Sequence, residues 1–137
     1  MKTKRLIVTL IAITLGLSAY AGSIRPTALT CEYDQSPLID IQNPRLSWIN
    51  ENIKNTQGAA QTAYQIVVAT SPEWFDRPLW DSGKKSTSES AFIVYNGPKL
   101  NSRTTYYWRV RVWDEKDKAS KWSEPASWHV GMLDKNE

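Results

Sequence analysis

Few side chains in this sequence could carry a reaction, and their spacing forms no reactive pattern. The only histidine, His129, and the only cysteine, Cys31, lie far apart in the chain. A nucleophilic triad would have to use His129, and no nucleophile-elbow motif accompanies it. One histidine without acids at ligand spacing predicts no metal site, and no glycine-rich loop is present to hold a phosphate. Fourteen acidic residues make chance carboxylate pairs unavoidable, so no pair indicates glycosidic-bond cleavage. We therefore expect no catalytic residue, no cofactor and no metal.

Aromatic side chains are the remaining candidates for a binding role. The chain has seven tryptophans, six tyrosines and two phenylalanines. Rings on loops or outer sheet faces combine an apolar surface with polar tips and can stack against sugars. The candidates for sugar stacking are Trp74 and Phe75 in a loop, and Tyr107 and Trp113 in a strand. The same rings could instead pack in a core or against arginines, and the sequence leaves both alternatives open.

The segment 104–114, TTYYWRVRVWD, has the clearest pattern and predicts a central β-strand. Side chains alternate between the two faces of a strand. One face is apolar and is expected to meet a core; it consists of Tyr106, Trp108, Val110 and Val112. The other face can stay half wet, because arginine and aromatic side chains carry polar tips on apolar bodies; it consists of Tyr107, Arg109, Arg111 and Trp113.

The half-wet face predicts a stack of cations and rings. A neighbouring strand is expected to begin at Trp122, in the run Trp-Ser-Glu-Pro. We predict that guanidinium groups and rings alternate in a ladder made of Tyr107, Arg109, Arg111, Trp113 and Trp122. This arrangement resembles the arginine–tryptophan ladder of cytokine-receptor fibronectin domains, and its expected purpose is structural.

The rest of the chain predicts partners for this strand. Short β-favouring segments are separated by turn formers and charged loops, and no amphipathic helix is expected. The predicted strands are 26–32, 45–49, 61–70, 79–83, 91–95 and 122–130, in addition to the central one. We place Trp48 at the centre of the core and expect Cys31 to be a small buried hydrophobe. The fold class is all-β: an immunoglobulin-like, fibronectin type III-like antiparallel β-sandwich of about seven strands.

Leu100 and Tyr106 resemble a fibronectin type III pattern at the start of the penultimate strand. The resemblance implies a tyrosine corner, in which the Tyr106 ring packs inward. Its hydroxyl is then expected to bond a backbone carbonyl a few residues upstream.

The first residues predict export. Lys2, Lys4 and Arg5 precede an apolar run over 6–17, and Ala19-Tyr20-Ala21 supplies a small-residue cleavage pattern. We therefore expect a secretory signal peptide over 1–21, a β-sandwich over 22–133 and a polar tail or linker over 134–137. Removing the signal takes away three cations, which leaves a near-neutral chain with no expected nucleic-acid partner. The expected location is periplasmic or extracellular, without a membrane contact after cleavage.

Six stretches in order resemble the N-terminal region of bacterial α-L-rhamnosidases of glycoside hydrolase family 78. They are LTCE (29–32), NPRLSW (43–48), QTAYQI (61–66), LWDSGK (79–84), TYYWRVRVWD (105–114) and WSEPA (122–126). The resemblance covers residues 26–133. Two departures are the missing glycine in the run Pro37-Leu38-Ile39-Asp40 and the turn 115–118 without glycine, where Asp117 tolerates a left-handed conformation.

The resemblance implies a non-catalytic N-terminal module of an inverting enzyme that hydrolyses terminal α-L-rhamnose. The family's general acid and base are glutamates in a later helical barrel, so no catalytic residue is carried over to this chain. The implied partners are the downstream domains of such an enzyme. Two alternatives stay open: a secreted carbohydrate-binding module and a protein-interaction module. A self-sufficient hydrolase is the fourth, weakest hypothesis.

Overall fold

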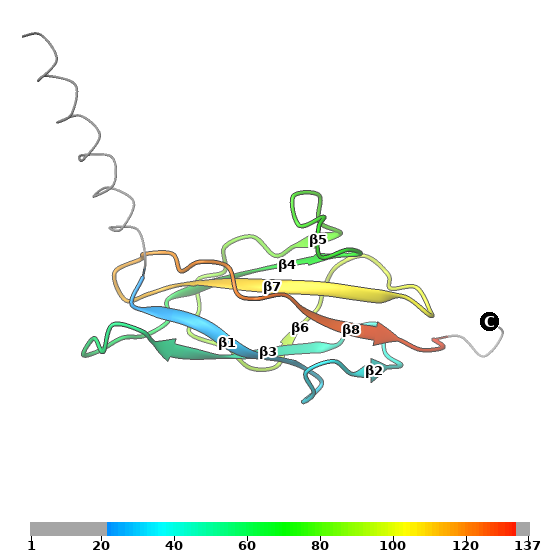
Figure 1. The fold of residues 1–137 in the computed structure, drawn as a ribbon, viewed down its shortest axis with the longest axis horizontal. Helices are drawn as coiled ribbons and strands as arrows, with labels where there is room; N and C mark the ends of the chain where they lie inside the picture. Colours follow the sequence, from blue (N-terminus) through cyan, green and yellow to red (C-terminus); the bar gives the residue numbers. More distant parts are fainter. Residues whose placement is uncertain (1–21, 134–137) are drawn as a thin grey trace, which may run out of the picture.

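The computed structural model describes residues 22–133, in which eight strands form two layers without a helix (Figure 1). The strands are β1 (Ile24–Cys31), β2 (Leu38–Ile39), β3 (Arg45–Asn52), β4 (Ala63–Ala69), β5 (Trp80–Asp81), β6 (Ile93–Val94), β7 (Thr105–Trp113) and β8 (Ala126–Val130). The predicted signal peptide over 1–21 and the tail over 134–137 lie outside the described residues.

The two layers are a three-stranded sheet in the order β1-β3-β6 and a five-stranded sheet in the order β2-β8-β7-β4-β5. Figure 1 shows β4 and β7 in one layer and β1 and β3 in the other. The predicted all-β sandwich is confirmed. The structure adds one detail that was not predicted: β2 is an eighth, two-residue strand, and it pairs with β8 in parallel. Two residues carry too short an alternation to be recognised in a sequence.

The central strand is β7, which lies between β4 and β8 in its sheet. Its side chains alternate strictly between buried and half-buried positions over nine residues. The inward side chains Trp108, Val110 and Val112 are completely buried, and Tyr106 is nearly so. Seven residue pairs join β7 to β4, so the register of this pair is fixed along its whole length. A slip by one residue would turn the arginines into the core.

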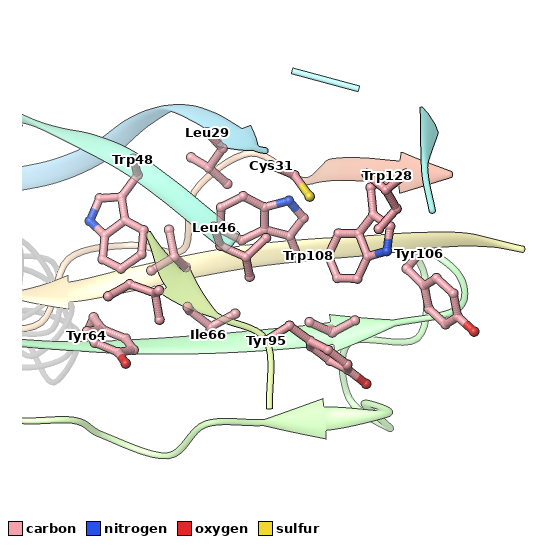
Figure 2. Packing of buried hydrophobic residues seen from close by; sticks show 14 of the residues in the cluster. Leu29, Cys31, Leu46, Trp48, Tyr64, Ile66, Tyr95, Tyr106, Trp108 and Trp128 are labelled. Atoms are coloured by element: carbon pink, nitrogen blue, oxygen red, sulfur yellow. The ribbon is translucent and has the colours of Figure 1, made fainter. Parts of the chain in front are cut away.

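Large aromatic rings fill the core between the sheets (Figure 2). Trp108 lies near the middle of this row, while Trp48 lies at one end with its ring 5.3 Å from that of Tyr64. The prediction that Trp48 occupies the centre is therefore wrong, although the residue is buried. At the opposite end the Trp128 ring packs against Tyr106 and Tyr95, at centroid distances of 5.7 and 5.8 Å.

The edge strand β1 begins two residues earlier than the sequence predicted, at Ile24. Its pairing with β3 shifts between Thr27 and Thr30, where an extra residue forms a bulge and Ala28 adopts a φ of 50°. The bulge moves the inward positions from even to odd numbers, so Ile24 and Pro26 are buried before it and Leu29 and Cys31 after it. A bulged edge with a proline also disfavours pairing with a further strand.

Several other strands are shorter than predicted. β8 begins only at Ala126, because Pro125 has no N–H to donate to the sheet. β5 and β6 keep two paired residues each of the predicted segments 79–83 and 91–95. The turn after β7 carries Asp117 in the left-handed conformation, at a φ of 59°, in place of a glycine.

Candidate functional site

The outer face of the five-stranded sheet carries a stack of cations and rings. The Arg109 guanidinium carbon lies 4.7 Å from the centroid of the Phe75 ring and 4.5 Å from that of Trp122. The Arg111 guanidinium carbon lies 4.8 Å from Trp122 and 5.0 Å from Trp113. All four distances are within the range of about 6 Å over which a ring attracts a cation.

A lysine extends the stack, because Lys84 Nζ lies 4.8 Å from the Trp113 ring. We call these six residues the arginine ladder; in order they are Phe75, Arg109, Trp122, Arg111, Trp113 and Lys84. Two members, Phe75 and Lys84, were not predicted for it. Phe75 comes from the loop after β4 and Lys84 from the segment after β5, so long-range contacts bring them to β7.

Three elements position the ladder. β7 supplies both arginines and Trp113 from alternate positions on one face. Trp122 precedes β8 and is held by its neighbour Ser123, whose N–H donates to the Val110 carbonyl at 2.8 Å. The Ser123 Oγ in turn accepts the Val110 N–H at 3.0 Å. These two bonds place the Trp122 ring beside the arginines although the residue lies outside a regular strand.

Tyr107, the fifth predicted ladder residue, lies on the same face but outside the stack. Among the contacts of the described residues, none joins its ring to either guanidinium group. Tyr107 packs instead against a small buried cluster made of Val67, Ala69 and Phe75. The structure thus brings together Arg109, Arg111, Trp113 and Trp122 of the predicted set.

The prediction that Phe75 stacks against sugars is wrong. Only 8 % of the residue is exposed, because the ring packs on Val67 and Ala69 and under Arg109. Trp113 is covered in part by Arg111 and Lys84, and Tyr107 is half-buried. Trp74, which is half exposed, is the predicted sugar-stacking residue whose ring stays open to solvent.

Polar contacts hold two of the three cations of the ladder, Arg111 and Lys84. Arg111 Nε donates to Gln65 Oε1 at 2.9 Å, and Gln65 Nε2 donates to Asp81 Oδ1 at 2.9 Å. Lys84 forms an ion pair with Asp117 at 2.7 Å. Burial, with the neighbouring charge of Arg111, lowers the pKa of Arg109 from its ordinary value. Its Nε is buried without a hydrogen-bond partner among the described residues, so ring contacts stabilise this cation in place of hydrogen bonds.

Two buried polar residues organise loops and were missed in the sequence. Asp114 accepts backbone N–H bonds from Ser23, Lys116 and Lys118, each at 2.9 Å. Gln61 accepts the indole N–H of Trp48 at 3.1 Å, and its amide donates to two backbone carbonyls of the segment 87–89. The position of Asp114, directly after a strand and before a charged turn, is a weak sequence signal for its role in organising that turn.

Two open grooves flank the sandwich. One, of about 750 Å³, lies between β1 and the segment 121–127, and Glu124 is the acid in its lining. The other, of about 500 Å³, lies beside β5 and β6 and has Glu89 as its acid. Neither lining offers the two facing carboxylates that glycoside hydrolysis uses. Within residues 22–133, no cluster of three metal-binding side chains occurs, and no helix is long and apolar enough to cross a membrane.

The Tyr106 hydroxyl accepts the N–H of Asn101, five residues upstream, at 2.8 Å. The expected partner of the hydroxyl was a backbone carbonyl, and the structure shows a backbone amide instead.

A two-sheet sandwich with a tyrosine corner and an arginine ladder is typical of an immunoglobulin-like domain of the fibronectin type III kind. The chain belongs to the family of Rha78A-like, N-terminal immunoglobulin domains, whose family model matches residues 26–134.

This chain matches a small part of several longer proteins. An α-L-rhamnosidase of Streptomyces avermitilis is 42% identical over 114 residues, which are 82% of this chain and 11% of that protein. One from Formosa agariphila is 39% identical over 72% of this chain and 10% of its own length.

Solved structures agree. The crystal structure of the S. avermitilis enzyme complexed with L-rhamnose superposes with a TM-score of 0.78, at 42% identity. The superposed region covers 82% of this chain and 11% of that one. An α-L-rhamnosidase structure from Dictyoglumus thermophilum gives 0.76 at 34% identity, over 82% of this chain and 13% of that one. The chain thus spans about one tenth of the length of these relatives.

Proposed function

We propose that this chain acts as the non-catalytic N-terminal sandwich of an exported α-L-rhamnosidase. Such an enzyme would hydrolyse terminal α-L-rhamnose from plant glycans or glycosides, with its reacting groups in other domains. The observation that carries the proposal is the match of residues 26–134 to this domain family, together with relatives that are α-L-rhamnosidases. The proposed location, periplasmic or extracellular, rests on the signal-peptide pattern of residues 1–21.

The contacts of the domain support a structural role. Its buried acid, Asp114, is engaged by three backbone amides, and its paired cations lie in ring stacks or beside carboxylates. Groups held this way stabilise loops and faces, and they are poorly placed to exchange protons with a substrate.

A chimera tests the proposal. The matching segment of the S. avermitilis enzyme, at 42% identity, is replaced by residues 26–133 of this chain. We expect rhamnosidase activity and a melting temperature near those of the parent enzyme, whereas deletion of the segment lowers both. A soluble chimera without activity would contradict a shared role. Turnover of p-nitrophenyl α-L-rhamnoside by the purified chain alone would contradict a non-catalytic one.

Carbohydrate binding is the second candidate function, and the exposed ring of Trp74 is the observation that favours it. Titration of L-rhamnose or rhamnogalacturonan against tryptophan fluorescence tests it. A saturable change in the wild-type chain that is lost in Trp74→Ala supports this function, and a flat titration removes it.

A further inference from the structure

The outer face of the three-stranded sheet exposes several large apolar side chains. Ile49 is 63 % exposed at the middle of β3. Phe92 and Val94, which lie beside Ser47 and Arg45 in the first half of β3, are about half exposed. Tyr33, at the end of β1, is 71 % exposed. No described element covers these side chains. We call this surface the β3 face: the outward side chains of β1, β3 and β6 with the adjoining Tyr33.

Two aromatic residues of the β3 face are held in a costly backbone conformation. Tyr33 has a φ of 73° and Phe92 a φ of 58°, which bulky residues rarely adopt. Their rings lie 5.4 Å apart, and the Arg45 guanidinium carbon lies 5.5 and 5.6 Å from their centroids. The contacts with Arg45 and between the rings therefore hold an exposed aromatic cluster in place.

Charges are arranged at the two ends of the β3 face. At one end Arg25 on β1 pairs with Glu51 on β3, at 2.9 Å. At the other end the order is reversed, because Glu32 follows β1 and Arg45 begins β3, and these two pair at 2.8 Å. Between the two ion pairs lie short or apolar side chains, with Thr27 opposite Ile49 and Thr30 opposite Ser47.

The charge arrangement of the β3 face is complementary to the same face of a second copy. We consider two such faces stacked on each other and related by a two-fold axis, which runs between them, perpendicular to the strands and level with residue 48. The axis lays β3 on the β3 of a second copy in antiparallel fashion, so that Arg45 lies over Glu51 of the second copy. It also lays Glu32 over Arg25 of the second copy, so each cation meets a carboxylate. A two-fold axis that runs along β3 itself would place Arg45 over Arg45 of the second copy, which like-charge repulsion disfavours.

We propose that the β3 face binds a second copy of this chain as a face-to-face, antiparallel dimer. Ile49 lies near the axis, and the four charged positions form a polar rim around it. β3 has eight residues, about 27 Å long, and three strands span about 15 Å. This footprint is smaller than the area of about 800 Å² per partner that stable interfaces bury. The dimer is therefore weak and forms as the concentration of the chain rises.

Analytical ultracentrifugation of the purified chain over a range of concentrations tests the proposal. We expect a reversible monomer–dimer equilibrium with a dissociation constant on the order of 100 µM. Ile49→Glu places two carboxylates near the axis, one from each copy, and their repulsion should raise the dissociation constant at least about tenfold. Leu38→Glu is the matched control: Leu38 is 73 % exposed but lies on β2, outside the β3 face, so the constant should stay unchanged.

A second variant keeps the test decisive if Ile49→Glu fails to fold, as judged by near-ultraviolet circular dichroism. Glu51→Lys, at a half-exposed position, puts a cation over Arg45 of the second copy and should also abolish the dimer. A chain that stays monomeric to about 1 mM overturns the proposal. If the β3-face variants and Leu38→Glu change the dissociation constant equally, the proposal is overturned as well.

Discussion

At the scale of single residues, Tyr106 shows how one hydroxyl ties a loop to the core. Its ring is buried against Trp128, while its oxygen accepts the Asn101 N–H at the mouth of the loop before β7. Tyr106→Phe leaves that amide without its partner, and we expect a loss of about 1–3 kcal/mol in the free energy of unfolding. Chemical denaturation measures it. Tyr107→Phe is the matched control on the half-buried side of the same strand, and equal midpoints for the two variants would contradict the assignment.

Asp114 is a carboxylate whose ionised form the fold stabilises. Burial alone would raise its pKa, but the backbone N–H bonds from Lys118, Ser23 and Lys116 prevail and lower it below the ordinary value. A carboxylate with a lowered folded pKa stabilises the fold above its unfolded pKa, about 3.9, and this contribution is lost as the pH falls through the folded value.

Asp114→Asn should therefore destabilise the chain at neutral pH, since an amide group cannot accept all three N–H bonds. The stability gap between wild type and variant should narrow as the pH falls below about 4. Urea denaturation from pH 7 to pH 2.5 measures the gap. Asp76→Asn, in an exposed loop, is the matched control, and a constant gap for Asp114→Asn would contradict the prediction.

At the scale of elements, the arginine ladder holds β7, the segment before β8 and the loop after β4 together. Trp122 is its central ring, with both arginines within 5 Å of its centroid. Trp122→Ala removes two cation–ring contacts at once, and we expect a loss of about 1–2 kcal/mol. Equilibrium unfolding measures it, with Trp74→Ala as the matched control within about 0.5 kcal/mol of wild type.

A double-mutant cycle identifies the ladder contact itself. Arg109→Ala and Trp122→Ala should show a coupling of about 0.5–1 kcal/mol, because their groups lie 4.5 Å apart. Additive losses would mean that the stack contributes only through buried area.

At the scale of the whole molecule, Cys31 reports global opening. The thiol is 1 % exposed, and burial, with the nearby charge of Glu32, raises its pKa to about 12. At pH 8 the native chain should therefore resist iodoacetamide, while the unfolded chain should react rapidly. The alkylation rate should follow the unfolding free energy as urea is added. Rapid reaction without denaturant would show that the sandwich opens locally at β1.

Much of the molecule follows from residue types alone. The nine-residue alternation of β7 predicted which side chains face the core, and the structure has them there. The pairing of two arginines with nearby tryptophans was also visible, because both sit at alternate positions of recognisable segments. Asp117 was expected to tolerate a left-handed turn, and it adopts one.

Other features depended on contacts between distant segments. Phe75 seemed a free loop ring, but the loop folds back and buries it under Arg109. β2 has two residues, and only its pairing with β8 makes it a strand. Residue type alone did not distinguish Trp48 from Trp108 as the centre of the core. The way the two sheets stack places Trp108 near the middle of the core and Trp48 at one end (Figure 2).

The sequence by itself determined the period of each strand and therefore its dry and wet faces, because that alternation is a local property of an extended backbone. Only the tertiary structure decided which segments meet across the sandwich, which rings the arginines contact and which apolar face stays open. Those outcomes depend on closing loops between residues far apart in the chain, and neighbouring residue types do not specify that geometry.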